Sequence, residues 1–126
     1  MSDEVRDELK YTETHEWVHV KGKNAIVGIT DHAQSELTDI VFTELPKVGT
    51  HISKDDELCV VESVKSVSEI YAPVSGKIVK VNEELEDTPE IINENPYDDG
   101  WLVEIELSDP SEVDGLLDAA AYKKLL

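Results

Sequence analysis

The feature that most constrains the fold is a series of short strand-forming runs separated by turn residues. Residues 16–20 and 25–29 are two such runs around Lys-Gly-Lys-Asn at 21–24, so we predict a hairpin there. Further strands are predicted at residues 40–45, 58–64, 67–72, 77–82 and 102–107. Glycine, proline, asparagine and aspartate punctuate these runs, and the pattern as a whole predicts a mainly β domain.

Two helical regions are predicted, one inside the chain at residues 32–37 and one at its end at residues 109–125. Asp31 is a suitable N-cap for the first helix. Asp109 followed by Pro110 combines an N-cap with a favoured first helical residue, and so starts the second region. A glycine and an aspartate within the terminal region favour two short helices over one.

The length of the chain predicts a single domain over residues 1–126. There is no long apolar run, so a membrane-spanning helix is not expected. The segment 1–10 is acidic and lacks the apolar stretch of a secretory signal. We therefore expect a cytoplasmic bacterial or archaeal protein, or a mitochondrial matrix protein if the chain has already been processed.

The chain is strongly acidic, with 29 aspartate and glutamate residues against 11 lysine and arginine residues and a formal net charge of -18. Phosphate binding needs clustered basic residues, so nucleic acid and anionic membrane are not expected as partners. The acidity either maintains solubility, for example in a salty cytoplasm, or steers the protein toward basic surfaces on partner enzymes.

Lys65 lies between two predicted strands, where the chain must reverse. A lysine at a hairpin tip is either a solubilising residue or an attachment point that a modifying enzyme can reach. Tight hairpin turns favour Asn-Gly or Gly-X, and Val64-Lys65 is neither, so the turn needs another explanation. A Schiff-base role for Lys65 would require a desolvating pocket, which a hairpin tip does not provide.

A histidine motif at residues 15–19 and the single cysteine are expected to be structural features and not functional sites. Residues 15–19 read His-Glu-Trp-Val-His, the zinc signature of metalloproteases, with His32 or His51 as a conceivable third ligand. That signature works on a helix, whereas this segment is predicted to be extended, which would separate the two histidines by roughly 13 Å. No metal site is therefore expected. Cys59, the single cysteine, lies in an apolar run and is expected to be a buried structural thiol.

Residues 61–78, VESVKSVSEIYAPVSGKI, resemble the lipoylation segment of the glycine cleavage system H-protein family. Other segments are similar to the same family in the same order: residues 11–17 (YTETHEW), 27–34 (VGITDHAQ), 39–49 (DIVFTELPKVG), 81–85 (VNEEL) and 91–101 (IINENPYDDGW), and the terminal segment around Tyr122. The resemblance covers nearly the whole chain.

The resemblance implies a mainly β, biotinyl/lipoyl-type barrel-sandwich hybrid with a short internal helix and one or more C-terminal helices. It also implies a monomeric carrier without catalytic residues, bearing lipoate in amide linkage on Lys65. Such a carrier takes the aminomethyl group of glycine from a pyridoxal-phosphate glycine decarboxylase (P-protein) to a tetrahydrofolate-dependent aminomethyltransferase (T-protein). It passes electrons to dihydrolipoyl dehydrogenase (L-protein), and a lipoate ligase or lipoyl transferase would load it.

The resemblance also suggests two sets of site residues. The residues expected to direct lipoylation of Lys65 are Glu62, Ser63, Val64 and Ser66. The residues expected in a groove beside the hairpin are Thr14, His15, Glu16 and Glu69. For the two groove carboxylates, ordinary solvated side chains are the alternative.

Two residues depart from the family pattern, since Thr38 and Asp55 stand where the family usually has glycine. Aspartate tolerates a left-handed backbone better than threonine, so the local backbone is in question mainly at Thr38.

Two other carrier roles remain open: an H-protein-like lipoyl relay serving lipoate transfer or sulfur metabolism, and a biotin carrier. The second is disfavoured because no methionine flanks Lys65.

Overall fold

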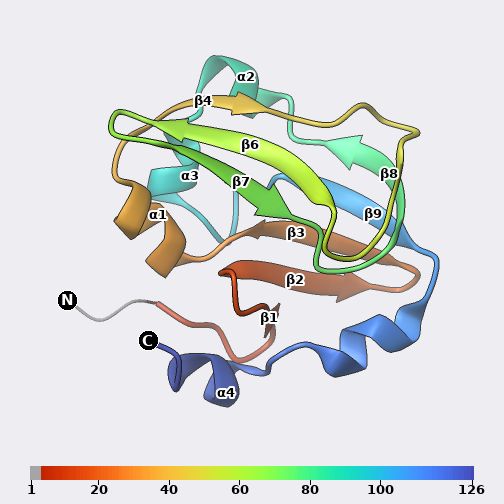
Figure 1. Ribbon diagram of the computed structural model, residues 1–126. Helices are drawn as coiled ribbons and strands as arrows, with labels where there is room; N and C mark the ends of the chain where they lie inside the picture. Colours follow the sequence, from red (N-terminus) through yellow and green to blue (C-terminus); the bar gives the residue numbers. More distant parts are fainter. Residues whose placement is uncertain (1–3) are drawn as a thin grey trace.

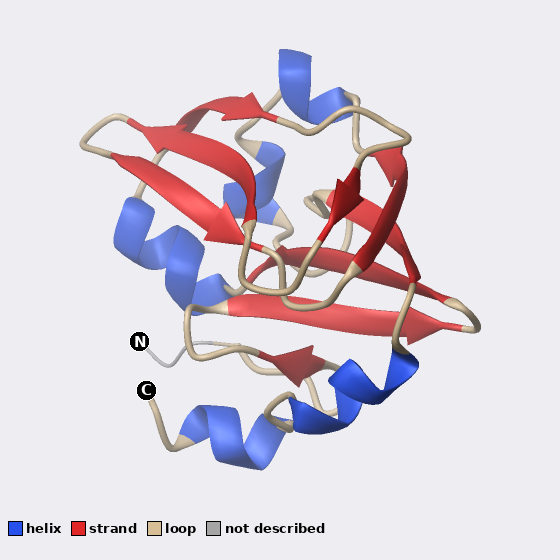
Figure 2. Ribbon diagram, turned by 45° about the vertical axis from the view of Figure 1, so that its right-hand side comes forward, coloured by secondary structure: helices blue, strands red, loops and turns tan. Residues whose placement is uncertain are grey.

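The computed structural model describes residues 4–126 and contains two β-sheets that face each other, with short helices at the edges (Figures 1 and 2). Within those residues, one sheet has six strands in the order β1-β2-β3-β9-β8-β5, and the other has three in the order β4-β6-β7. The strands are β1 (Lys10–Tyr11), β2 (Glu16–Lys21), β3 (Asn24–Ile29), β4 (Ile40–Glu44), β5 (His51–Ile52), β6 (Glu57–Ser63), β7 (Val67–Tyr71), β8 (Gly76–Val81) and β9 (Val103–Leu107).

The predicted strands are confirmed to within one residue at each end. The hairpin of β2 and β3 turns where Lys21 pairs with Asn24, and Gly22 supplies the positive φ of 62° that the turn requires. The two-residue strands β1 and β5 were not predicted, because each is too short to produce an alternating pattern. They form the two outermost strands of the larger sheet.

The internal helix α1 (Asp31–Leu37) is confirmed, but the prediction that Asp31 caps it is wrong. Thr30 is the N-cap, because its Oγ1 accepts a hydrogen bond from the N–H of Ala33 at 3.2 Å. The last region forms two pieces, as predicted: a 3-10 helix at Pro110–Gly115 and helix α4 (Ala119–Lys123). Two further helical turns, α2 (Glu84–Asp87) and α3 (Ile91–Glu94), were not predicted.

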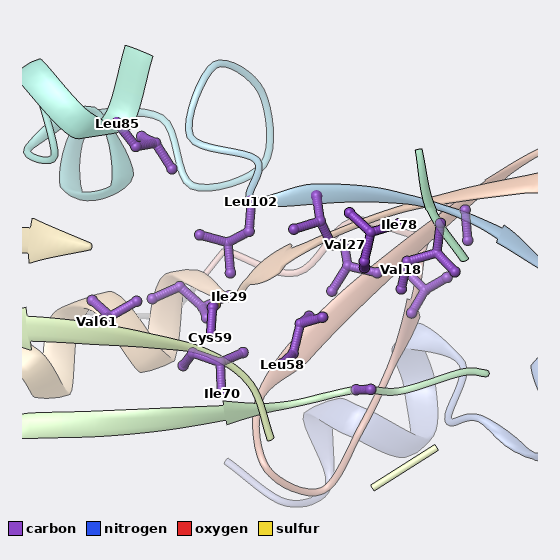
Figure 3. Packing of buried hydrophobic residues seen from close by; sticks show 14 of the residues in the cluster. Val18, Val27, Ile29, Leu58, Cys59, Val61, Ile70, Ile78, Leu85 and Leu102 are labelled. Atoms are coloured by element: carbon purple, nitrogen blue, oxygen red, sulfur yellow. The ribbon is translucent and has the colours of Figure 1, made fainter. Parts of the chain in front are cut away.

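The main core lies between the two sheets. Figure 3 shows Val61 and Ile70, from β6 and β7, on the side of the three-stranded sheet that faces Ile29 and Leu102. Each fully buried side chain of this size contributes about 1.5–3 kcal/mol. This packing holds the hairpin of β6 and β7 rigid up to the point where it extends past α1 (Figure 1).

A second, aromatic cluster joins both ends of the described chain to the larger sheet. The rings of Tyr11 and Tyr122 are stacked with centroids 4.5 Å apart, and Trp17 donates from Nε1 to the carbonyl of Pro96 at 2.8 Å. Trp17 lies over Gly28, where any larger residue would collide with its ring. Tyr11, Trp17, Tyr97 and Tyr122 are all buried in this cluster. The single-domain prediction for residues 1–126 is compatible with this arrangement, although residues 1–3 of its acidic segment lie outside the described part.

No helix within residues 4–126 is long and apolar enough to cross a membrane.

Candidate functional site

The tip of the hairpin formed by β6 and β7 presents Lys65 to solvent. Glu62 and Val67 are the last paired residues, and beyond them the N–H of Ser63 donates to the carbonyl of Ser66 at 2.8 Å. Val64 and Lys65 therefore form a two-residue turn. Across residues 4–126, neither of them is among the residues with positive φ, so the turn is not one of the two usual tight hairpin types.

The side chain of Ser63 explains how this turn is held. Its Oγ accepts from the N–H of Lys65 at 3.3 Å and of Ser66 at 3.1 Å, and lies 3.3 Å from the Ser66 carbonyl, to which it can donate. The residue is buried, with 8% of its surface exposed. The N–H of Val64 also donates to the carbonyl of Asp39 at 3.0 Å. The main chain of Lys65 is thus anchored while its side chain remains in solvent.

The other three residues predicted to direct lipoylation lie around this turn in different environments. Glu62 is half-buried, whereas Val64 and Ser66 are exposed. An enzyme that approaches Lys65 could therefore contact Glu62, Val64 and Ser66 directly. Ser63 faces inward and is occupied by main-chain groups, so it could act only through the turn.

Three of the four predicted groove residues, Thr14, His15 and Glu69, line one depression of about 220 Å³ between α1 and β7. The apolar side chains of Leu37 and Ile70 also line it. His15 has φ of 70°, and its Nδ1 lies 2.7 Å from the hydroxyl of Tyr122. Its ring is 4.6 Å from that of His32, which lines the same depression. Glu69 is exposed in β7, four residues beyond Lys65.

Glu16 lies instead in a neighbouring depression of about 290 Å³, and the alternative of an ordinary solvated carboxylate is wrong for this residue. Only 2% of the residue is exposed. Its Oε1 accepts from the hydroxyls of Thr12 at 2.6 Å and Thr14 at 2.5 Å, and Tyr71 lines the same depression. Burial outweighs these hydrogen bonds and raises the pKa of Glu16 above its ordinary value. Thr14 lines both depressions and connects them.

The chain is similar in sequence to known proteins over nearly its whole length. A sequence model of the family described as Glycine cleavage H-protein matches residues 9–126. A glycine cleavage system H protein of Myxococcus xanthus (strain DK1622) is 53% identical over 126 residues, which cover 100% of this chain and 98% of that protein. Another, of Staphylococcus haemolyticus (strain JCSC1435), is 57% identical over 122 residues, or 97% of each chain. The chain belongs to the glycine cleavage H-protein family.

A solved structure of the family agrees with this assignment. The crystal structure of a glycine cleavage system H protein from Mycobacterium marinum matches with a TM-score of 0.88 and 37% identity, over 95% of this chain and 97% of that chain. The predicted biotinyl/lipoyl-type barrel-sandwich fold is therefore confirmed. H-proteins are the lipoyl carriers of the glycine cleavage system, and the predicted class of protein is confirmed with the family.

The two departures from the H-protein pattern both fall on a left-handed backbone. Thr38 has φ of 67° with ψ of −148°, and Asp55 has φ of 74°. Glycine occupies such conformations without a steric cost, which accounts for the glycine that the family resemblance leads us to expect at these positions. The backbone at Thr38 is therefore strained, and the strain at Asp55 is smaller because aspartate tolerates a left-handed backbone better.

Residues 16–19 of the His-Glu-Trp-Val-His segment are extended, as predicted, whereas His15 lies in a bend with φ of 70°. His15 precedes β2, and His19 lies within it with an exposed side chain. Among residues 4–126 no group of three or more histidine, cysteine, aspartate or glutamate side chains is placed to hold a metal ion. The buried thiol predicted at Cys59 is confirmed, and burial raises its pKa to about 12.

Tyr71 is a site residue that the sequence analysis did not identify. Its hydroxyl donates to Oε2 of Glu69 at 3.0 Å, and this interaction raises the pKa of the Tyr71 phenol. Tyr71 also lines the depression that contains Glu16, so it lies between the carboxylates of the two depressions. The signal was present in the sequence, because residues two apart on a strand lie on the same face.

Proposed function

We propose that this chain is the lipoyl-carrying H-protein of the glycine cleavage system, with lipoate attached in amide linkage to Lys65. The observation that carries this proposal is the anchored turn, which combines a solvent-exposed lysine side chain with a main chain held by Ser63 and Asp39. A modifying enzyme can reach such an amine without unfolding the sheet. The proposal follows the family to which the chain belongs.

The lipoyl group would supply a dithiolane that accepts the aminomethyl group of glycine together with two electrons. The chain would do no bond chemistry of its own. Its partners would be glycine decarboxylase, the tetrahydrofolate-dependent aminomethyltransferase and dihydrolipoyl dehydrogenase, and a lipoate ligase or lipoyl transferase would charge it. A tether on Lys65 replaces free diffusion between these enzymes with a local search. The bacterial relatives support a cytoplasmic location as part of this proposal.

The depression between α1 and β7 is the proposed resting place of the carried group. Glu69 offers a carboxylate to a cationic amine, Thr14 offers a hydroxyl, and Leu37 and Ile70 offer an apolar wall. An exposed ion pair contributes under about 1 kcal/mol, so exclusion of water would provide most of the protection. Glu16 would act indirectly, because its carboxylate accepts the hydrogen bond that orients Thr14.

Attachment at Lys65 is tested with a lipoate ligase, ATP and lipoate. Lys65→Arg should fold normally and gain no lipoyl mass, because a guanidinium stays protonated and cannot be acylated. Lys77→Arg, which changes another exposed lysine in β8, is the matched control and should be lipoylated as the unmodified sequence is. Intact mass spectrometry reads both variants. Equal lipoylation of Lys65→Arg would overturn the assignment.

The resting place is tested on lipoylated protein loaded with the aminomethyl group, without the folate enzyme present. Glu69→Gln should release formaldehyde faster than the unchanged protein, since it weakens the hold on the cationic amine. Glu57→Gln removes an exposed carboxylate from the same hairpin and is the control. Matching release rates for all three proteins would mean that Glu69 does not guard the carried group.

A further inference from the structure

The outer face of the three-stranded sheet carries exposed apolar side chains next to Lys65. Within residues 4–126, the exposed fractions are 53% for Val41, 48% for Phe42, 65% for Val64 and 64% for Val67. Most large apolar side chains on the other elements are buried. These four residues, together with Glu62, are here called the tip face. The core does not require them, because their opposite neighbours on the same strands fill it.

The strand register places three residues of the tip face, Phe42, Glu62 and Val67, in one row. Phe42 on β4 pairs with Glu62 on β6, and Glu62 pairs with Val67 on β7. Directly paired residues point to the same side of a sheet, so Phe42 and Val67 flank the Glu62 side chain. The register shifts between Ile40 and Phe42, and this irregularity leaves both Val41 and Phe42 exposed. Bulges of this kind commonly redirect side chains at functional edges.

The charged side chains on the three strands that carry the tip face are all acidic. Strands β4, β6 and β7 carry no lysine or arginine, while Glu44, Glu57, Glu62 and Glu69 lie along them. Lys65 is the cation between them, at the tip. A complementary surface would have an apolar centre to cover Phe42 and Val67, and basic residues at its rim.

We propose that the tip face is the docking surface of the enzyme that acylates Lys65, and that this enzyme presents an apolar centre with a basic rim. This inference rests on the proposed function. In the reaction the Lys65 amine attacks the carbonyl carbon of a lipoyl adenylate. The amide bond forms, the bond from that carbon to the phosphate oxygen breaks, AMP leaves, and the amine loses a proton to solvent.

Geometry selects this enzyme over the other partners. The acylating enzyme meets a bare lysine, so its reactive carbonyl must come within bonding distance of Nζ and its surface must come close to the adjacent sheet. The enzymes that act later reach a group at the end of a long tether, so they need not cover the hairpin. Covering the tip face is therefore a requirement of the first encounter alone.

The test measures initial rates of lipoylation with a bacterial lipoate ligase, ATP and lipoate at increasing carrier concentrations. Phe42→Ser should raise KM about tenfold with kcat within about twofold, since a central aromatic contact typically dominates such an interface. Val67→Thr keeps a β-branched residue in the strand and should raise KM by a smaller factor. Val20→Ser, at a 40% exposed site on β2, is the matched control and should behave as the unchanged protein.

Two comparisons make the inference falsifiable. Thermal unfolding of every variant verifies folding, and Val67→Thr carries the test if Phe42→Ser does not fold. Unchanged KM for the folded tip-face variants would overturn the inference. So would an equal loss in aminomethyl loading by glycine decarboxylase with fully lipoylated variants, because the face would then serve another partner. Failure of the unchanged protein to be lipoylated would instead overturn the proposed function.

Discussion

Replacing Thr38 with glycine should stabilise the protein. The residue has φ of 67° and ψ of −148°, close to a region of backbone space that is essentially restricted to glycine. A non-glycine residue held in such a region costs about 1–3 kcal/mol. Glycine costs about 0.5–1 kcal/mol in extra unfolded-state entropy, so the net gain expected for Thr38→Gly is about 1 kcal/mol.

The Thr38 side chain is exposed and makes no hydrogen bond within residues 4–126, so little opposes this gain. The N–H of Thr38 donates to the carbonyl of Gln34 at 3.0 Å, and its own carbonyl accepts from Nδ2 of Asn93 at 2.8 Å. Both bonds remain available to glycine. At about 2.1 cal/mol/K per residue, a chain of this length gains about 4 °C in Tm per kcal/mol.

Urea titration and thermal unfolding by circular dichroism measure the effect. Thr38→Ala is the control, because it removes the β-branch but keeps a Cβ and therefore keeps most of the strain. Asp55→Gly should give a smaller gain, since aspartate tolerates φ of 74° better than threonine tolerates its own conformation. If Thr38→Gly is no more stable than Thr38→Ala, the assignment of backbone strain to this residue is refuted.

Three further predictions concern buried groups. Cys59, whose pKa burial raises to about 12, should resist thiol reagents at pH 8 until the protein unfolds, and rapid labelling of native protein would contradict this. The pKa of Glu16 is raised by burial, so its protonated form contributes stability below the unfolded pKa of about 4.5, and this is lost as pH rises through the higher folded value. The free energy of unfolding, measured relative to Glu16→Gln, should therefore decline with pH over that window, whereas a constant difference would mean that Glu16 titrates normally. Gly28→Ala should cost about 1–3 kcal/mol, because its Cβ would lie 2.6 Å from the Trp17 ring, and Gly115→Ala, with open space around it, is the control for the urea titration.

Local patterns in the sequence were sufficient to predict most of the secondary structure. Alternation and turn residues located the hairpin of β2 and β3 and the strands on either side of Lys65. The helix cap shows the limit of such patterns. Thr30 and Asp31 are both good capping residues. Thr30 caps α1 because the backbone is still extended there, after β3, and becomes helical at Asp31.

The candidate site divides in the same way. The position of Lys65 between two strands, and its similarity to a family motif, were visible in the sequence, whereas the turn that holds Lys65 was not. Two central residues without positive φ would not be expected to form a tight hairpin, and the explanation lies in Ser63. The Ser63 hydroxyl accepts hydrogen bonds from the N–H groups of the turn. The carbonyl of Asp39, from a separate segment, accepts a further bond from the N–H of Val64.

The sequence by itself determined the class of fold, the family and the lysine at the hairpin tip, because these depend on residue types at short spacing and on ordered motifs. Only the tertiary structure decided the environments of the carboxylates. Glu16 and Glu69 are the same residue type and look alike in the sequence. In the structure, Glu16 is buried and accepts hydrogen bonds from two threonine hydroxyls, whereas Glu69 is exposed on β7. Burial is a property of what the rest of the chain places around a side chain, so the short-range pattern could not distinguish them.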